Sequence, residues 1–507
     1  MHQGSRLRPT LAGLALLALT ASARSEVPTP AASPASAPAE RPSAEAAARP
    51  RASIEAGPML QAMEKLAADV KGWGGTVGVA FADVGTGETV AARDGHVAFN
   101  PASNAKLVTA AAALRLLGPG HRFVTGLYGK LDGDRVPELV LRGQGDPSLD
   151  GGALWPMVRE LVTAGVRRVG AIVVDQSYFD DRFVPPAFEE QPNEWAPFRA
   201  PVSAVALDEN TVTLSVRAAE KGKDAQVRVD PIGFVDVVGT VRTTKKGDPE
   251  KITLELSPKG DRLVARVGGH LPENSRVVRV RRRLDDPRLV PGHALRAVLA
   301  SAGIEVEGAV KLGGAKEKRL LASHRSRPLG ELLALLGKDS DNFYAEMIFK
   351  AVGAEKKARP GTAEGAAEVI TAYLKEIGAF EEGMVVKNGS GLFDANRITP
   401  LGTTALLRAA YRDVTMGPEF LAHLAVGGAD GTLRGRFKNL GDRGIVRAKT
   451  GTLNAVASLS GYVLGPPGRA PLAFSIYVNG IPGKVGQARG GIDKVVEAAA
   501  RALWKDR

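Results

Sequence analysis

The chain has 507 residues, with 67 lysines and arginines against 55 aspartates and glutamates, and a formal net charge of +12 at pH 7. Because it contains no cysteine, it can form neither a disulfide nor a lipid-modified cysteine. The basic residues are scattered along the chain, which favours a solvated basic surface over attraction to anionic polymers or lipid headgroups. No nucleic-acid-reading module is recognisable, so we expect no nucleic-acid partner.

The first 54 residues predict two segments that precede a folded body. Arginines, an apolar run that ends at Leu19 and then small residues are typical of a cleaved signal peptide over 1–23. Residues 24–54 are rich in Ala, Pro, Ser, Glu and Arg, which predicts a disordered spacer. The apolar run has about ten residues, fewer than the roughly twenty of a membrane-spanning helix. We therefore expect an exported, periplasmic protein with at most peripheral membrane contact.

From residue 55 onward, changes of apolar period predict helices and strands. The first expected elements are a helix at 59–70, a strand at 76–83, a helix at 107–117 preceded by Ser103, and a strand–helix–strand unit at 138–142, 154–162 and 168–175. Short runs between 211 and 282, separated by Gly, Pro and Lys turns, predict a β-rich part. Helical patterns return at 293–302 and 329–336.

These changes of character predict a body that is interrupted by a large insertion. We expect the body at 55–120 and 322–507, an inserted domain at 121–224 and 286–321, and a nested β subdomain at 225–285. The length after the spacer is enough for roughly three domains.

Three short motifs in a fixed order indicate an acyl-transferring serine enzyme. Ser-Asn-Ala-Lys at 103–106, Ser-Asp-Asn at 340–342 and Lys-Thr-Gly at 449–451 form the S-x-x-K, S-D-N and K-T-G set of penicillin-binding proteins and class A β-lactamases. The first motif arises by chance about once or twice in such a chain, and each of the others in roughly one chain in ten or twenty. All three in the expected order are therefore a specific signal.

More than two hundred residues separate the two serine motifs. In this long separation the chain resembles the D-alanyl-D-alanine carboxypeptidase/endopeptidase family of penicillin-binding protein 4, serine peptidase family S13. In that family, extra domains interrupt a transpeptidase-like body. Further strings fit: GDPSL at 145–149, APVSAVALDEN at 200–210, SDNFYAEM at 340–347, GSGL at 389–392, ADGTL at 429–433 and AKTGTL at 448–453. The resemblance covers nearly all of the chain after residue 54. It departs at Asn388, where the family usually has Asp, which leaves the role of this turn open.

The resemblance implies an α+β fold: a penicillin-binding, β-lactamase-like transpeptidase domain with an antiparallel sheet flanked by helices, interrupted by an insertion with a nested β subdomain. It implies a serine D,D-carboxypeptidase/endopeptidase that acts on peptidoglycan peptides through a Ser103 acyl-enzyme and releases D-Ala or cuts crosslinks. β-Lactam antibiotics are the expected covalent inhibitors. No cofactor or metal is expected, and the oligomeric state stays open.

The chemistry can also be argued from the residues. A serine hydroxyl needs an adjacent base, and Lys106 lies three positions after Ser103, on the same face of a helix. Burial and a second cation, for which Lys449 is the candidate, both favour a neutral lysine. In the family interpretation Lys106 activates Ser103, Ser340 relays a proton toward the leaving group, and Asn342 holds the substrate amide and steadies Lys106.

The Lys-Thr-Gly string precedes TLNAVASLSGYVL, which predicts an edge strand that binds an extended peptide, with Gly451 leaving room for close approach. Thr450 and Thr452 are expected to bind a terminal carboxylate, with Lys449 supplying positive charge. The backbone N–H groups of Ser103 and Thr452 are the expected oxyanion hole.

Other residues have weaker signals. Asp146, Asp430 and Ser390 are expected to have structural roles in turns, because Asp and Ser are common turn formers. An acidic group near Glu194 is a candidate for binding the free amine of a diamino acid in the substrate. The segment 492–504 reads as an amphipathic helix, and we expect its Ala-rich face to pack against the sheet and not against a membrane.

Other reaction classes find little support, since the chain has no H-E-x-x-H, no G-x-S-x-G and no phosphate-loop ending. Two alternative functions stay open. One is a β-lactamase, which shares the acylation step but needs fast deacylation, and no clear equivalent of a dedicated deacylating Glu is visible. The other is a catalytically silent wall-binding scaffold. The chain retains all the reactive side chains, which argues against this alternative.

Overall fold

The computed structural model describes residues 56–314, 319–441 and 444–505. The signal peptide expected at 1–23 and the spacer expected at 24–54 lie outside the described residues.

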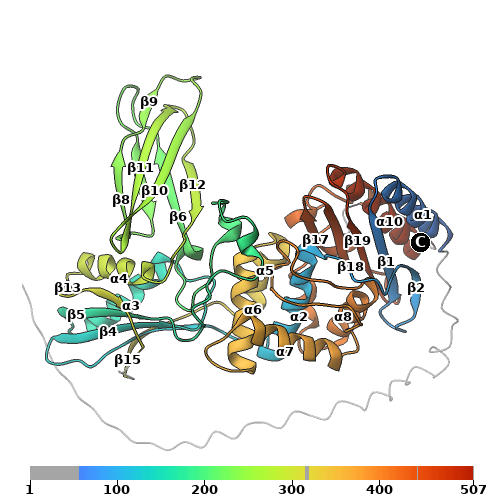
Figure 1. The fold of residues 1–507 in the computed structure, drawn as a ribbon, viewed down its shortest axis with the longest axis horizontal. Coiled ribbons are helices and arrows are strands. Elements are labelled where there is room, and N and C mark those ends of the chain that lie inside the picture. Colours follow the sequence, from blue (N-terminus) through green and yellow to red (C-terminus); the bar gives the residue numbers. More distant parts are fainter. Residues whose placement is uncertain (1–55, 315–318, 442–443, 506–507) are drawn as a thin grey trace, which may run out of the picture. The chain divides into compact units, whose positions relative to one another are not determined.

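A six-stranded antiparallel sheet carries the Lys-Thr-Gly motif (Figure 1). Its strands, in spatial order, are β16 (Ala425–Val426), β17 (Val446–Leu453), β18 (Val456–Val463), β19 (Leu472–Asn479), β1 (Thr76–Asp83) and β2 (Thr89–Arg93). Strand β1 pairs with β19 along its full length, from Thr76 opposite Asn479 to Asp83 opposite Leu472. Segments from the two ends of the described chain therefore form one sheet.

Helices cover both faces of this sheet (Figure 1). Helices α1 (Gly57–Gly72) and α10 (Val485–Trp504) pack against each other on one face, and α8 (Pro400–Arg412) packs on the other. Helix α10 buries Ile492, Val496 and Leu503 in the core beneath the sheet, so the expected packing of its apolar face is confirmed. Within the described ranges, no helix has the length and apolar character needed to cross a bilayer.

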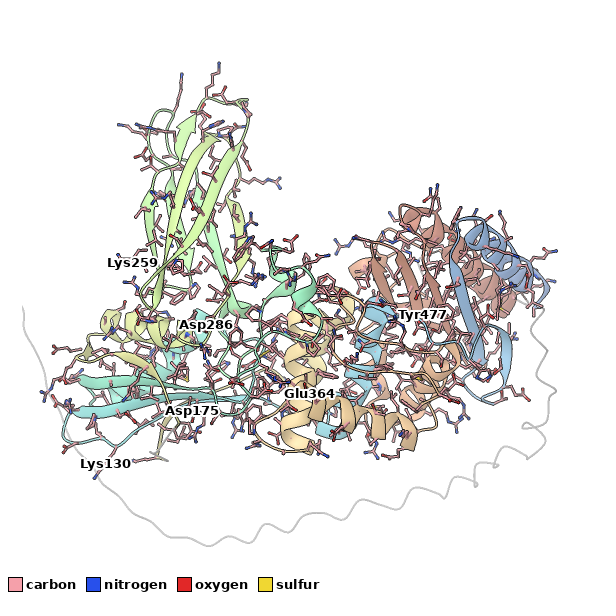
Figure 2. All side chains as sticks on the ribbon, in the orientation of Figure 1. Lys130, Asp175, Lys259, Asp286, Glu364 and Tyr477 are labelled. Atoms are coloured by element: carbon pink, nitrogen blue, oxygen red, sulfur yellow. The ribbon has the colours of Figure 1, made fainter. Side chains whose placement is uncertain are left out.

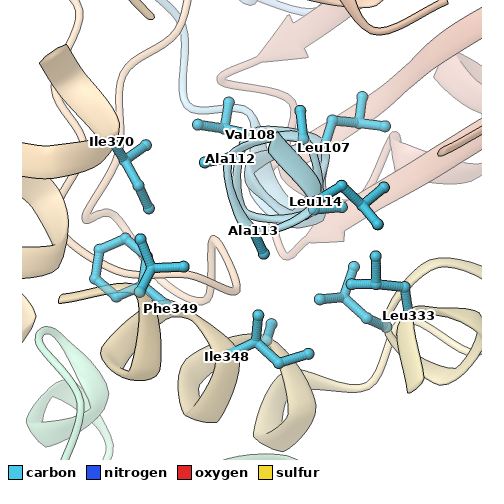
Figure 3. Packing of buried hydrophobic residues seen from close by; sticks show 14 of the residues in the cluster. Leu107, Val108, Ala112, Ala113, Leu114, Leu333, Ile348, Phe349 and Ile370 are labelled. Carbon is cyan, nitrogen blue, oxygen red and sulfur yellow. The ribbon is translucent and has the colours of Figure 1, made fainter. Parts of the chain in front are cut away.

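Helix α2 (Ala105–Leu117) is the central helix of the catalytic body, and its residues from Ala105 to Leu114 are all buried. Its neighbours are α5 (Leu329–Lys338), α6 (Asn342–Lys356) and α7 (Ala363–Glu376). Figure 3 shows Leu333, Ile348 and Phe349 around the alanine-rich face of α2. Small side chains let helices approach closely. This packing fixes the start of α2, where the first motif lies.

Residues 124–325 contribute a second, mixed sheet. It contains β3 (Val124–Tyr128), β4 (Arg135–Gly143), β5 (Arg168–Asp175), β13 (Glu305–Val306), β14 (Val310–Leu312) and β15 (Leu320–Arg325). Parallel strands β4 and β5 are joined by α3 (Gly151–Thr163), which confirms the expected strand–helix–strand unit. Helix α4 (Val290–Ser301) packs against α3 and β5.

Two smaller sheets form the β-rich part. The first contains β6 (Thr211–Arg217), β7 (Gln226–Asp230) and β12 (Val278–Arg283), and the second β8 (Val235–Gly239), β9 (Arg242–Thr244), β10 (Lys251–Lys259) and β11 (Arg262–Pro272). Leu214, Val241 and Leu271 belong to their shared core, and charged side chains such as Lys259 project outward (Figure 2). Strands β8 and β9 are short, and β8 has no buried residue; the sequence pattern did not predict them.

Two strand pairings differ from the expected domain boundaries. Strand β6 lies before residue 225 but pairs with β7 and β12 and shares the core of the nested β part. Strand β15 begins at Leu320 and continues past 322, yet it pairs with β3 of the second sheet. The remaining division into domains stays a prediction.

The segment expected as one edge strand after Lys-Thr-Gly is a hairpin instead. Strand β17 ends at Leu453 and β18 begins at Val456, because a two-residue turn reverses the chain. Strand β18 lies between β17 and β19 and is buried throughout. The edge role belongs to β17: β16 pairs only with Arg447 and Ala448, and beyond them the outer edge of β17 has no strand partner in the described part of the chain.

Candidate active site

The nucleophile candidate Ser103 lies in a one-turn 3-10 helix, Ala102–Asn104, that leads into α2. Ala102 has a φ of 46°, and its N–H donates to Oδ1 of Asn100 at 2.8 Å. Ser458 of β18 donates from Oγ to the carbonyl of Pro101 at 2.8 Å. These contacts fix the turn, and Ser103 lines a cavity of about 960 Å³ together with Ser340, Asn342 and Thr452.

Lys106 brings the first two motifs together. Its side chain is fully buried, and its Nζ lies 3.1 Å from Oγ of Ser103, 2.7 Å from Oδ1 of Asn342 and 2.8 Å from the carbonyl oxygen of Ser390. Nδ2 of Asn342 donates to the carbonyl of Phe198 at 3.0 Å, which turns the amide oxygen toward the lysine. Amide and carbonyl oxygens only accept hydrogen bonds. A neutral Lys106 therefore donates to both and directs its lone pair at the Ser103 hydroxyl.

Burial lowers the pKa of Lys106 from 10.5 to about 7, against the opposing charges of Glu346 and Asp341. A buried ammonium loses hydration, which favours the neutral amine. Burial, followed by repulsion from Lys106, also lowers the pKa of Lys449 well below its usual range. The sequence analysis named burial and Lys449 as joint causes for Lys106. Burial is the dominant cause, and the principal charge effects on Lys106 come from the two carboxylates.

Glu346 is a site residue that the sequence analysis missed. It is buried in α6 and accepts hydrogen bonds from the N–H groups of Gly389 at 3.1 Å and Ser390 at 2.8 Å. It thereby holds the loop whose Ser390 carbonyl contacts Lys106. The signal was present, since Glu346 lies four positions after Asn342, on the same face of the helix.

Ser340 and Lys449 bring the second and third motifs together. Nζ of Lys449 donates to Oγ of Ser340 at 2.8 Å and to the carbonyl of Thr450 at 2.7 Å. Ser340 has a φ of 61°, and Asp341 then caps α6 by accepting from the N–H of Tyr344 at 2.9 Å. This left-handed residue followed by a helix start lets Ser340 contact Lys449 while Asn342 contacts Lys106.

Gly451 lets β17 approach the nucleophile turn. A Cβ atom at this position would lie 2.1 Å from Oγ of Ser458, 2.8 Å from the carbonyl of Pro101 and 3.0 Å from the backbone nitrogen of Ser103. No larger residue fits without displacing this turn. The backbone of β17 therefore runs directly beside Ser103, as close approach to an edge strand requires.

The two threonines of the third motif have polar partners that the sequence analysis did not predict. Oγ1 of Thr450 donates to Oγ1 of Thr432 at 2.9 Å. Oγ1 of Thr452, an exposed residue, accepts from Nη2 of Arg489 at 2.6 Å. Arg489 belongs to α10, which the sequence analysis treated only as a packing helix.

The turn residues make contacts that suit structural roles. Oδ1 of Asp146 accepts from the N–H and hydroxyl of Ser148 at 2.8 and 2.7 Å. Asp430 accepts from the N–H of Val426 at 2.7 Å and pairs with Lys338. Ser390 differs, because its carbonyl accepts from Nζ of the catalytic lysine candidate, while its hydroxyl accepts from the N–H of Leu392 at 3.2 Å and forms a hydrogen bond with Glu346.

The side chain of Asn388, the departure from the family pattern, makes four hydrogen bonds. Its Oδ1 accepts from the N–H of Gly391 at 2.9 Å and from Asn396 at 2.9 Å. Its Nδ2 donates to the carbonyls of Pro186 at 3.0 Å and Leu392 at 3.2 Å. An ionised aspartate only accepts, so this turn uses both halves of an amide.

Glu194, near which an acidic amine-binding group is a candidate, is not among the residues that line the cavity. Oε1 of Glu194 accepts from the N–H of Ala196 at 2.9 Å, and the cavity is lined by Glu190 and Gln191 instead. These residues belong to a 3-10 turn, Phe188–Glu190, and its exit, which the sequence pattern did not predict.

Comparisons with known proteins identify the family of the chain. A family model described as the D-Ala-D-Ala carboxypeptidase 3 (S13) family matches residues 59–501. The chain is 34% identical over 436 residues to a D-alanyl-D-alanine carboxypeptidase of an Actinomadura species, which covers 81% of this chain and 79% of that protein. It is 26% identical over 425 residues to D-alanyl-D-alanine carboxypeptidase DacB of Haemophilus influenzae, covering 80% and 86% of the two chains.

The fold is also similar to a solved structure. The crystal structure of penicillin binding protein 4 from Haemophilus influenzae matches with a TM-score of 0.70 at 24% identity, covering 87% of this chain and 98% of that chain. The resemblance inferred from the motifs and the expected α+β fold class are therefore confirmed.

Proposed function

Because the chain belongs to the D-Ala-D-Ala carboxypeptidase 3 (S13) family, a family of serine hydrolases, we propose that it cleaves peptidoglycan peptides through an acyl-enzyme on Ser103. The observation that carries the assignment is the position of Lys106 Nζ, 3.1 Å from Oγ of Ser103 and 2.7 Å from Oδ1 of Asn342. It joins a nucleophile, a buried amine and the second motif in one cavity.

In the first half of the reaction, neutral Lys106 takes the proton of Ser103 as the oxygen attacks the D-Ala carbonyl. The C–N bond then breaks as Ser340, which Lys449 contacts at 2.8 Å, gives its proton to the leaving amine and receives the proton that Lys106 holds, so that Lys106 is neutral again. In the second half, Lys106 takes a proton from water as the water oxygen attacks the ester, and it returns this proton to Oγ of Ser103 as the C–O bond breaks. A base and a leaving-group acid together make both halves feasible near neutral pH.

Strand β17 is the proposed binding edge for the substrate. Its outer side beyond Ala448 is open to backbone pairing with an extended peptide. The N–H groups of Ser103 and Thr452 form the proposed oxyanion hole, because Gly451 keeps this strand against the nucleophile turn. Asn342 holds the substrate amide, and Thr450 and Thr452 face its carboxylate end.

The leaving group decides between the two peptidase activities. Release of free D-Ala is carboxypeptidase action, and release of a branched peptide amine is endopeptidase action. Both use the same acyl-enzyme, so we propose both for this site. The penicillin binding protein 4 of Haemophilus influenzae has been crystallised with a β-lactam; we propose that β-lactams acylate Ser103 here, and that the protein works in the periplasm.

The test uses the purified protein, a pentapeptide ending in D-Ala-D-Ala, and a labelled penicillin. We expect release of D-Ala, and a slowly hydrolysed label on the peptide that contains Ser103, found by mass spectrometry. Rapid penicillin hydrolysis would assign the protein to the β-lactamases. If the protein showed neither a label nor D-Ala release, the remaining function would be the catalytically silent wall-binding scaffold.

The pH dependence of acylation is a separate prediction. Since the base must be neutral and its pKa is lowered to about 7, the acylation rate should rise with pH through about 7. Glu346→Gln removes the larger opposing charge, so the Lys106 pKa falls further and the rising limb moves to lower pH. Asp341→Asn, which retains a good helix cap, should move it less. Stopped-flow acylation by penicillin across pH measures this, and a shift to higher pH in either variant would contradict it.

A further inference from the structure

We infer that Arg489, together with Thr452, recognises the terminal carboxylate of the substrate. This inference rests on the proposed function and adds a specificity residue to it. Nη2 of Arg489 donates to Oγ1 of Thr452 at 2.6 Å. Thr452 lines the same cavity as Ser103, so the guanidinium lies at the end of the site where β17 presents Thr452.

The position of Arg489 is fixed by the fold. Val485 and Gly486, in the first turn of α10, also line the cavity. Ala488, the residue before Arg489, is fully buried in the core between α10 and the sheet. The backbone that carries Arg489 is therefore anchored, while its side chain is exposed and contacts Thr452, which lines the cavity.

The hydrogen-bonding capacity of this pair is largely unused. Arginine has five N–H donors, and the contact with Thr452 uses one of them. Because Arg489 donates to the threonine oxygen, the hydroxyl hydrogen of Thr452 stays available to an acceptor. Among the residues that the structure describes, no carboxylate forms an ion pair with Arg489. A substrate carboxylate beside Thr452 thus meets an O–H and a planar N–H fork, the arrangement that binds carboxylates in a bidentate manner.

The other candidates for this role are already engaged. Lys449 is fully buried, bonds to Ser340 and Thr450, and has a pKa lowered well below its usual range by burial. Two of its N–H donors are therefore already used inside the protein. The hydroxyl of Thr450 donates to Thr432. Arginine keeps its charge at all relevant pH values, so Arg489 supplies the cation that the carboxylate needs.

The experiment compares two substrates that differ only at the C-terminus. One is the pentapeptide ending in D-Ala-D-Ala carboxylate, and the other is its C-terminal amide. For Arg489→Ala, we expect kcat/KM to fall about tenfold to a hundredfold with the carboxylate, the size of a lost charge-assisted hydrogen bond, and about twofold or less with the amide. Arg489→Lys should recover part of the loss, because it keeps the charge but not the fork.

Arg501→Ala is the matched control. Arg501 lies on the same helix and pairs with Glu497 at 3.8 Å, so this variant makes the same substitution away from the site and should leave both substrates unaffected. Thermal unfolding of each variant shows that the fold is kept.

The inference is overturned if Arg489→Ala lowers kcat/KM equally for both substrates, or lowers it for neither. It is also overturned if the unaltered enzyme has the same kcat/KM for the carboxylate and the amide. The proposed function fails separately, if the unaltered enzyme releases no D-Ala from the pentapeptide.

Discussion

Ser103→Ala is expected to abolish penicillin labelling and to lower D-Ala release by about 10⁶-fold, the scale of losing a catalytic serine. The reason is that Ser103 supplies the hydroxyl that lies in the cavity 3.1 Å from Nζ of Lys106. Mass spectrometry of the labelled protein and chromatography of released D-Ala measure the two losses.

Ser301→Ala serves as the control for this change. Ser301 ends α4, and its hydroxyl donates to the carbonyl of Ala297 at 2.8 Å. Both activities should be normal in this variant. If Ser103→Ala kept its D-Ala release, the nucleophile assignment would be wrong.

Lys106→Ala is expected to lower acylation by about 10³-fold or more, since a general base contributes roughly 10²–10⁴-fold and also orients the nucleophile here. Lys106→Met removes the amine but keeps most of the side-chain volume, and it should lower acylation as much as Lys106→Ala does. Lys106→Arg should not restore it, because a guanidinium is not deprotonated in proteins. Stopped-flow labelling with penicillin measures all three.

The matched control is Lys494→Ala, an exposed lysine of α10, which should acylate at the normal rate. Thermal unfolding distinguishes lost chemistry from a lost fold, because Lys106 is fully buried. Normal labelling of a folded Lys106→Met protein would exclude the proposed base.

Much of this site was predictable because its motifs carry their own geometry. A serine and a lysine three residues apart on a helix must share a face, and Ser103 and Lys106 do so. That Lys449 would meet Ser340 could not be derived from spacing, because that contact depends on how β17 is placed beside α6. The sequence predicted Lys449 only as a cation near Lys106 and the substrate carboxylate, and the structure shows its contact with Ser340 at 2.8 Å.

The residues that were missed act through tertiary contacts. Glu346 contacts a loop more than forty residues away, and Arg489 contacts Thr452 from a different helix. Arg489 forms no local pattern with the motifs, and the i, i+4 spacing of Asn342 and Glu346 does not reveal the contact of Glu346 with that loop. Strand β18 was misjudged for a related reason, since an apolar run does not tell whether it lies at the edge of a sheet or inside it.

The pairing of β1 with β19 has a consequence for biosynthesis. Thr76 lies opposite Asn479, so the body that holds the nucleophile cannot close until the chain as far as Asn479 has been made. Contacts of such high sequence separation slow folding, because the intervening loop must be ordered first. A chain in which these strands have not yet paired carries Ser103 and Lys106 without the contacts of β17 and β18 that complete the site, and we expect it to be chemically inert until these strands dock.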